Sequence, residues 1–211
     1  MKKLESSITN MILVLVGVAL VTGAILAYVN NVTAGPIKEQ AEKTLTDGIK
    51  KVMGGRDDVK VSASKPITQN IKGKELTYVI HLTQDSKGND LGAAVESTTN
   101  GFGGDLKVLV GFNTEGEILG YTILQTAETP GLGAKAQDWF QKDGKGNIIG
   151  RNPSVPLTVN KDGGKVNAIT ASTITSRAFL SAVNNAYNAY ASMVGNKTAD
   201  ASTGATKVNK N

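Results

Sequence analysis

Hydroxyl side chains gather at one junction near the C-terminal end of the chain, where a β-type run meets a helix. Residues 166–190 read VNAITASTITSRAFLSAVNNAYNAY, and the hydroxyl side chains ahead of the helix are those of Thr170, Ser172, Thr173, Thr175 and Ser176. Such residues cap the free N–H groups of a helix start, and the positive end of the helix dipole favours a phosphate there. The junction therefore suits either plain N-capping or a bound or attached phosphate.

Two glycine-rich segments precede this junction. Residues 97–104 read STTNGFGG, and residues 128–133 read ETPGLG. Glycine lets backbone N–H groups approach a ligand closely, and loops of this kind can cradle a phosphate. The first segment lacks the lysine and hydroxyl pattern of a P-loop. From their own residues, both segments are interpreted as turns, with a ligand-binding loop as the alternative.

Composition excludes several kinds of centre. Cysteine is absent, which rules out disulfides, thiolate-ligated iron–sulfur clusters and c-type haem attachment in this chain. The single histidine, His81, cannot form a multi-histidine metal site, and its place in an alternating run predicts an exposed strand position. The net charge of +5 comes with only 5% aromatic residues and no nucleic-acid-binding motif. We expect no catalytic residues, no metal site and no nucleic acid partner.

An apolar stretch near the N-terminus predicts a membrane anchor. Residues 11–29, MILVLVGVALVTGAILAYV, carry no charge and are long enough to span about 30 Å of hydrocarbon as a helix. Residues 22–24 offer only a weak cleavage site, which favours a retained anchor over a signal peptide. Lys2 and Lys3 predict that residues 1–10 lie in the cytoplasm and that the chain after residue 30 lies on the outer side.

The elements that must position the hydroxyl junction form an α+β pattern. Pro36 predicts the start of a membrane-proximal helix within residues 30–55, which Gly54 and Gly55 end. Alternating apolar residues predict strands at 75–82 and 91–95, and a hairpin that joins 106–112 to 118–124.

Weaker patterns predict the remaining elements. Short strands are expected at four further places, residues 59–61, 148–149, 156–159 and 166–169, with a hairpin turn at 162–164 between the last two. A helix with one buried face is expected from Arg177 onward. The tail, residues 195–211, has no apolar periodicity and is expected to be disordered, so the main domain spans residues 56–194.

Three segments behind the N-terminal span carry a family resemblance, in their order as well as in their letters. They read GFGGDLKVLVGFNTEGEILGYTIL, ETPGLG and NAITASTITSRAFLSAVNNA. Together they resemble the flavin-binding G subunit of the Rnf ion-translocating ferredoxin:NAD oxidoreductase, and its relative, the C subunit of the Na⁺-translocating NADH:quinone reductase. The resemblance extends from the anchor to about Met193.

The resemblance implies a covalent flavin. In the family, the FMN phosphate is attached to the last threonine of a motif Asp-x-x-(Ser/Thr)-Gly-Ala-Thr, which falls here on Thr173. This chain departs from the motif at Asn167, Ala171 and Ser172. A second match, DASTGAT, ends at Thr206 in the tail but lacks the strand and helix context. Thr173 is therefore the expected acceptor, with Thr206 as the alternative.

The resemblance also implies roles for residues that surround the flavin. Glu128, Thr129 and Leu132 match positions that line FMN, while Gly131 and Gly133 would let the backbone close on it. Ser172 and Thr175 are expected to hydrogen-bond the phosphodiester. For Gly103 and Gly104, a structural turn and a flavin contact remain equal alternatives.

These features together predict the function. We expect an FMN-binding domain with antiparallel hairpins and packed helices behind one transmembrane helix, in a bacterial cytoplasmic membrane. It would relay electrons inside a complex that couples ferredoxin oxidation by NAD to Na⁺ or H⁺ transport, without being catalytic alone. Expected partners are the other membrane, iron–sulfur and flavin subunits, and a flavin transferase. The alternatives are the C subunit of the quinone reductase and a flavin-free anchored scaffold.

Overall fold

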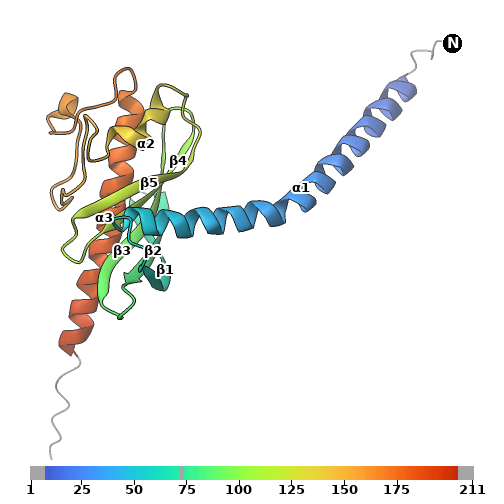
Figure 1. Cartoon of the computed structure of the whole chain (residues 1–211). Coiled ribbons are helices and arrows are strands. Elements are labelled where there is room, and N and C mark those ends of the chain that lie inside the picture. The colour runs from blue at the N-terminus through green and yellow to red at the C-terminus, as the bar shows by residue number, and fades with distance from the viewer. Residues whose placement is uncertain (1–7, 72–73, 204–211) are drawn as a thin grey trace, which may run out of the picture. The chain divides into compact units, whose positions relative to one another are not determined.

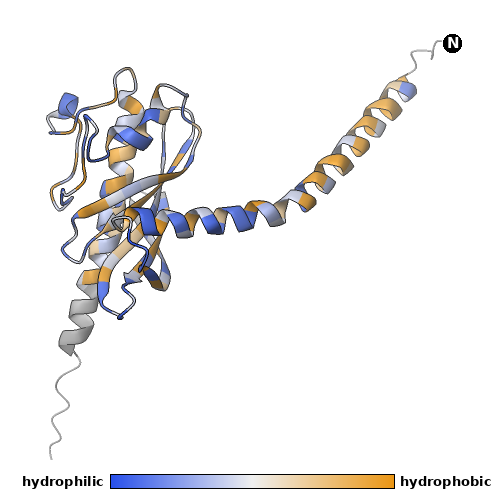
Figure 2. Ribbon diagram, in the orientation of Figure 1, coloured by the Kyte–Doolittle hydropathy of each residue, from blue (hydrophilic) through white to orange (hydrophobic). Residues whose placement is uncertain are grey.

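The computed structural model describes residues 8–71 and 74–203, so the alternative acceptor Thr206 lies outside the described residues. The chain separates into two units, Met1–Leu45 and Thr46–Asn211. The first unit is the greater part of helix α1 (Ile8–Val52), which is the one helix of the described residues long and apolar enough to cross a membrane, by length and composition. Figures 1 and 2 show this helix and its apolar N-terminal half.

Helix α1 runs without interruption through Pro36, whereas the sequence predicts a second helix that starts there. A proline inside a helix removes one N–H donor and crowds the carbonyl four residues earlier, so α1 continues past Pro36 without that one hydrogen bond. In the apolar half, the hydroxyl of Thr22 donates to the carbonyl of Val18 at 2.8 Å, so this polar group is satisfied within the helix. The predicted end of the helix is confirmed, since Gly54 and Gly55 follow Val52 in left-handed conformations.

The second unit is built on a five-stranded sheet with the order β1-β2-β3-β4-β5, in which every pair is antiparallel. Its strands are β1 (Lys60–Ile71), β2 (Lys74–Gln84), β3 (Asp90–Asn100), β4 (Asp105–Phe112) and β5 (Ile118–Thr126). The predicted β4–β5 hairpin and the predicted strand at 75–82 are confirmed. Strand β1 is far longer than the predicted edge strand at 59–61, because its polar residues pair with β2 along an exposed edge of the sheet.

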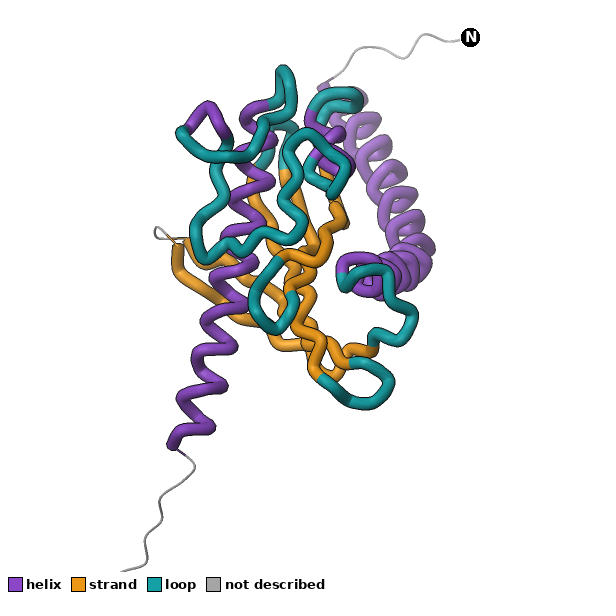
Figure 3. Tube along the Cα trace, turned by 60° about the vertical axis from the view of Figure 1, so that its left-hand side comes forward, coloured by secondary structure: helices purple, strands orange, loops and turns teal. Residues whose placement is uncertain are grey.

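Helix α3 (Thr173–Thr203) covers one face of this sheet, as Figure 3 shows. Its buried residues include Phe179, which stacks on Phe140 at 4.4 Å between ring centroids and meets Tyr121 edge-on at 4.7 Å. The helix starts at Thr173, one turn before the predicted start at Arg177, so most of the hydroxyl cluster lies in its first turn. It also extends to Thr203, into the segment that the sequence predicts to be disordered.

The last turns of α1 cover part of the opposite face. Ile49 and Val52 are buried there, and Gly111 of β4 and Gly120 of β5 face the backbone of Val52. A Cβ atom on Gly111 would overlap the carbonyl oxygen of Val52. These paired glycines therefore permit a contact between helix backbone and sheet backbone that a side chain would prevent.

Three of the predicted short strands are wrong. Residues 127–172 contain the 3₁₀ turns η1 (Gly133–Lys135) and η2 (Asn160–Asp162), the short helix α2 (Ala136–Trp139), and one isolated parallel bridge between Val159 and Val166. The apolar residues behind those predictions are nevertheless buried: Ile148, Leu157, Val159, Val166 and Ile169. These residues fill the core from loops. The apolar sequence pattern therefore indicated burial correctly but did not indicate strand pairing.

The predicted exposure of His81 is also wrong. Its side chain is 5% exposed, with Nδ1 at 2.8 Å from Ser64 Oγ and Nε2 at 2.8 Å from Glu96 Oε1. Glu96 also pairs with Lys107 on the neighbouring strand. Alternation does place His81 on the face opposite Tyr78 and Ile80, but that face carries a buried polar cluster where the sequence predicts solvent.

Candidate functional site

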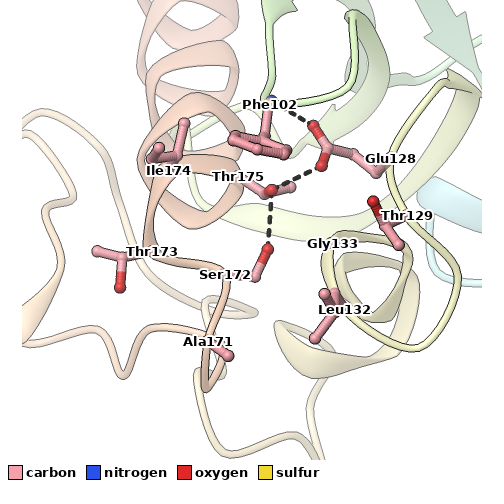
Figure 4. A pocket seen from close by; sticks show the side chains of 10 residues that line it. All are labelled: Phe102, Glu128, Thr129, Leu132, Gly133, Ala171, Ser172, Thr173, Ile174 and Thr175. Atoms are coloured by element: carbon pink, nitrogen blue, oxygen red, sulfur yellow. Dashed lines mark hydrogen bonds between the residues drawn. The ribbon is translucent and has the colours of Figure 1, made fainter.

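The residues predicted to bind a ligand meet at one cavity of about 380 Å³ beside the start of α3. Of the eight predicted positions, those that line it are Glu128, Thr129, Leu132, Gly133, Ser172, Thr173 and Thr175 (Figure 4). Gly131 is not among the lining residues and instead forms a turn with φ at +76°. The lining residues that sequence reasoning missed are Phe102, Ala171 and Ile174.

Glu128 connects the chain segments around the cavity. Its Oε1 accepts the backbone N–H groups of Phe102, at 2.6 Å, and Gly103, at 3.3 Å. Its Oε2 accepts the hydroxyl of Thr175 at 2.8 Å, and Ser172 Oγ donates to Thr175 Oγ1 at 2.9 Å. Glu128 is 7% exposed, so this carboxylate holds the glycine-rich turn and the α3 start together from within the protein.

Glycines make room for that carboxylate. A Cβ atom on Gly101 would overlap Glu128 Oε1, and a Cβ atom on Gly133 would overlap Oε2. Gly101 and Gly133 therefore pack directly against the carboxylate of Glu128. Gly103 belongs to this arrangement through its N–H bond, while Gly104 takes a φ of +144° at the turn.

The loop that leads into α3 is tightly constrained. Ser176 Oγ accepts the N–H of Ile169 at 2.9 Å and donates to the carbonyl of Ser172 at 2.9 Å. Ala171 has a φ of +59°, the left-handed region, and among the described residues it is the one non-glycine with a positive φ. The family motif has glycine at this position, so the backbone keeps the glycine-type conformation although the residue has a Cβ.

Thr173 stands apart from the chain of hydroxyls. Figure 4 shows its side chain on the other side of the loop from Ser172 and Thr175, and its Oγ1 accepts a hydrogen bond from Lys161 Nζ at 3.1 Å. Lys161 belongs to the turn η2, which α3 holds through Arg177 and Asp162 with contacts of 2.8 and 2.7 Å. Hydrogen bonding to Arg177, supported by its charge, lowers the pKa of the Asp162 carboxyl.

The cavity has room for a largely apolar ligand, with a hydroxyl and a cation at one edge. Its volume falls in the range of about 300–1,000 Å³ that is usual for ligand pockets. Phe102, Leu132 and Ile174 expose large apolar side chains at its wall, by 70%, 42% and 53%. Thr173 adds a hydroxyl at the start of a long helix, with an ammonium group beside it. FMN has both of the parts that this combination fits.

Comparison with known proteins decides the family. Residues 101–188 match the FMN-binding domain family. The chain is 31% identical over 184 residues to the G subunit of the Na⁺-translocating ferredoxin:NAD⁺ oxidoreductase complex of Acetobacterium woodii, a match that covers 84% of this chain and 89% of the relative. The chain belongs to the family of G subunits of ion-translocating oxidoreductase complexes.

Further relatives agree with this assignment. The G subunit of the ion-translocating oxidoreductase complex of Photorhabdus laumondii is 32% identical over 172 residues, which covers 78% of this chain and 81% of that protein. The crystal structure of the C subunit of the Na⁺-translocating NADH-quinone reductase from Parabacteroides distasonis has the same fold, with a TM-score of 0.51 at 16% identity over 74% of this chain and 94% of that one. The resemblance and the α+β fold expected from the sequence are confirmed, while the individual flavin contacts stay predictions.

Proposed function

We propose that this chain carries FMN through a phosphoester to Thr173 Oγ1 and relays electrons within a membrane-bound ion-translocating complex. The observation that carries the proposal is the difference in hydrogen bonding among the hydroxyl side chains at the cavity. Ser172 donates to Thr175 and Thr175 donates to Glu128, whereas the one hydrogen bond of the Thr173 hydroxyl within the described part of the chain is the one it accepts from Lys161, so its own proton is not engaged. Thr173 is thus the cavity hydroxyl best suited to become an ester. Its oxygen would bond to the phosphorus of an FMN unit supplied as a flavin dinucleotide, the bond between that phosphorus and the second nucleotide would break, and this nucleotide would leave with the proton of the hydroxyl.

The other residues would hold the flavin in place. FMN when bound supplies one- and two-electron redox chemistry that no side chain of this protein provides. Leu132, Phe102 and Ile174 offer apolar surface for the ring system, and Thr129 at the mouth of the cavity offers a hydroxyl for its polar edge. Glu128 would act indirectly, because both of its oxygens already fix the cavity wall.

The membrane arrangement is part of the same proposal. The apolar part of α1 would cross the bacterial cytoplasmic membrane once, with residues 1–10 in the cytoplasm and the FMN-binding domain on the outer side. Partners would be the other subunits of a ferredoxin:NAD oxidoreductase complex, which the name of the Acetobacterium woodii relative supports, and a flavin transferase. A covalent tether would keep the flavin from being lost on the outer side.

Mass spectrometry of the intact protein and of its peptides tests the attachment. The full chain, co-expressed with a flavin transferase, should gain one FMN-sized adduct, which Thr173→Ala abolishes and Thr206→Ala leaves intact. Loss of the adduct in Thr206→Ala alone would move the site to the tail. Absence of an adduct from the unmodified sequence would overturn covalent flavinylation and favour a flavin-free anchored scaffold.

A further inference from the structure

Lys161 is the charged residue nearest to the acceptor hydroxyl, and the proposed function gives it no role. Its ammonium group donates to Thr173 Oγ1 at 3.1 Å, although the two residues lie on different elements, η2 and α3. The hydroxyl that it contacts is the proposed ester oxygen. The lysine therefore already stands where the phosphate of an attached FMN would begin.

The turn that carries Lys161 is held in place from several sides. Asp162 receives both hydrogen bonds of Arg177, and the N–H of Asn160 donates to the carbonyl of Val166 at 2.8 Å. The side chain of Asn160 donates to Asn167 Oδ1 at 3.1 Å. Asn167 stands at the position of the acid in the family motif, and it accepts this bond through an oxygen that an aspartate would also offer, so the lysine-bearing turn is fixed against the acceptor loop in the same way that the motif residue would allow.

Lys161 is a cation available to a phosphate on Thr173. Arg177 is closer to the acceptor in sequence, but its guanidinium is engaged with Asp162 in a bidentate pair. The carboxylate of Glu128 lies across the cavity and is covered by its own hydrogen-bond donors. A phosphodiester at Thr173 would bring one negative charge within reach of an ammonium group that has no carboxylate partner among the described residues.

We propose that Lys161 is a positioning residue for the flavin phosphate. It holds the Thr173 hydroxyl at the cavity wall before attachment, and it pairs with the phosphodiester after attachment. This inference rests on the proposed function, because it needs FMN on Thr173. It assigns to η2 the role of presenting a cation, and to the Arg177–Asp162 pair the role of keeping that turn against α3.

The test compares loaded and unloaded protein for three variants of the full chain in detergent. Lys161→Met removes the charge, Lys161→Arg keeps it, and Lys165→Met removes an exposed charge elsewhere in the same loop. Two quantities are measured for each: the fraction of protein that carries the adduct after a fixed loading time, and the rise in Tm on loading at low and at high salt, followed by circular dichroism.

Lys161→Met should load several-fold more slowly and should show a rise in Tm that is smaller by about 1–3 °C at low salt, with the difference shrinking at high salt. Lys161→Arg and Lys165→Met should match the unmodified sequence. Because each rise in Tm is taken within one variant, a general loss of stability does not imitate the effect.

Two outcomes overturn the inference, and they differ in kind. If the unmodified chain carries the adduct on Thr173 and Lys161→Met matches it in both loading and Tm rise, Lys161 has no part in holding the phosphate while the proposed function stands. If the unmodified chain carries no adduct on Thr173, the proposed function falls and the role of Lys161 falls with it.

Discussion

Glu128 joins the segments of the cavity because its carboxylate accepts hydrogen bonds from two of them while its backbone belongs to the third. The bonds to Phe102, Gly103 and Thr175 use both oxygens, and the glycines at 101 and 133 leave room for the carboxylate that a side chain at either position would take. A buried carboxylate whose partners are all donors is intolerant of any group that itself donates.

Glu128→Gln should therefore destabilise the protein. One of the carboxylate oxygens becomes an amide NH₂ that faces either the backbone N–H groups or the Thr175 hydroxyl, which costs about 1–3 kcal/mol. The change is checked by urea denaturation, with Glu115→Gln at an exposed turn as the matched control expected within about 0.5 kcal/mol of the unmodified protein. Equal stability of the two variants would show that the carboxylate has no structural role.

Ala171→Gly should instead stabilise the protein. The left-handed conformation at Ala171 costs a residue with a Cβ about 1–2 kcal/mol, and glycine avoids this while adding about 0.5–1 kcal/mol of unfolded-chain entropy. We expect a net gain of about 0.5–1 kcal/mol in the free energy of unfolding. Ala191→Gly, the same change on the exposed side of α3, should instead lose about 1 kcal/mol. A loss in both variants would contradict the conformation described for Ala171.

Single residues were predictable where their own neighbours in sequence determine them. The proposed acceptor Thr173 and the loop around Glu128 could be singled out because motifs carry them. Lys161 and His81 were not, because their partners lie on other elements: Thr173 is on α3 and Glu96 is on a different strand from His81. A local pattern contains no information about which side chain faces a residue across the fold.

Among the elements, those in which apolar residues alternate as they do in a strand were predicted well. Strands β4 and β5 alternate and are joined by a short turn, so the hairpin follows from the sequence. The segments at 148–149, 156–159 and 166–169 have apolar residues of the same kind, but single backbone bonds and side-chain contacts hold them in place of extended strand pairing. Asn184, for example, bonds both the N–H and the carbonyl of Leu157, each at 2.9 Å.

The sheet should lose stability in acid because of Glu96. Burial alone would raise its pKa, but the hydrogen bonds from His81 and Lys107, with the charge of Lys107, outweigh burial, so the pKa of Glu96 is lowered from 4.5. A lowered pKa means that this stabilisation is complete above the ordinary pKa and is lost as the pH falls through the folded-state value.

The free energy of unfolding, measured in urea from pH 7 to pH 3, should show this. Glu96→Gln should be less stable at pH 7 by about 1–3 kcal/mol, and the gap to the unmodified protein should narrow below about pH 4.5. Glu115→Gln should follow the unmodified protein at every pH. If the difference in free energy of unfolding between Glu96→Gln and the unmodified protein stays constant across this pH range, ionisation of Glu96 does not contribute to stability.

At the scale of the whole molecule, the folded domain includes the end of the helix that begins as the apolar span. Ile49, Val52 and Met53 are buried within the unit that starts at Thr46. Burying each such side chain contributes about 1.5–3 kcal/mol, and their sum approaches the total stability of an ordinary domain, about 5–15 kcal/mol. A domain that starts at residue 56, as the sequence predicts, lacks these three buried side chains.

A shortened chain of residues 46–211 should therefore fold, and one of residues 56–211 should not. Size-exclusion chromatography and thermal melts separate the two outcomes: a monomer with a cooperative transition for the first, and aggregation or a broad, early transition for the second. Identical melts would mean that the last turns of α1 are dispensable for the sheet.

The bonds of Glu128 also have a consequence for biogenesis. Its carboxylate collects donors from residues 102, 103 and 175, which lie far apart along the chain. The cavity they enclose does not exist on the ribosome or in a denatured polypeptide; it comes into being only when the sheet and α3 have assembled. An enzyme that recognises this cavity can modify only chains that have already folded. A flavin on Thr173, as proposed above, would therefore be present only on folded protein, and its yellow colour would mark native chains.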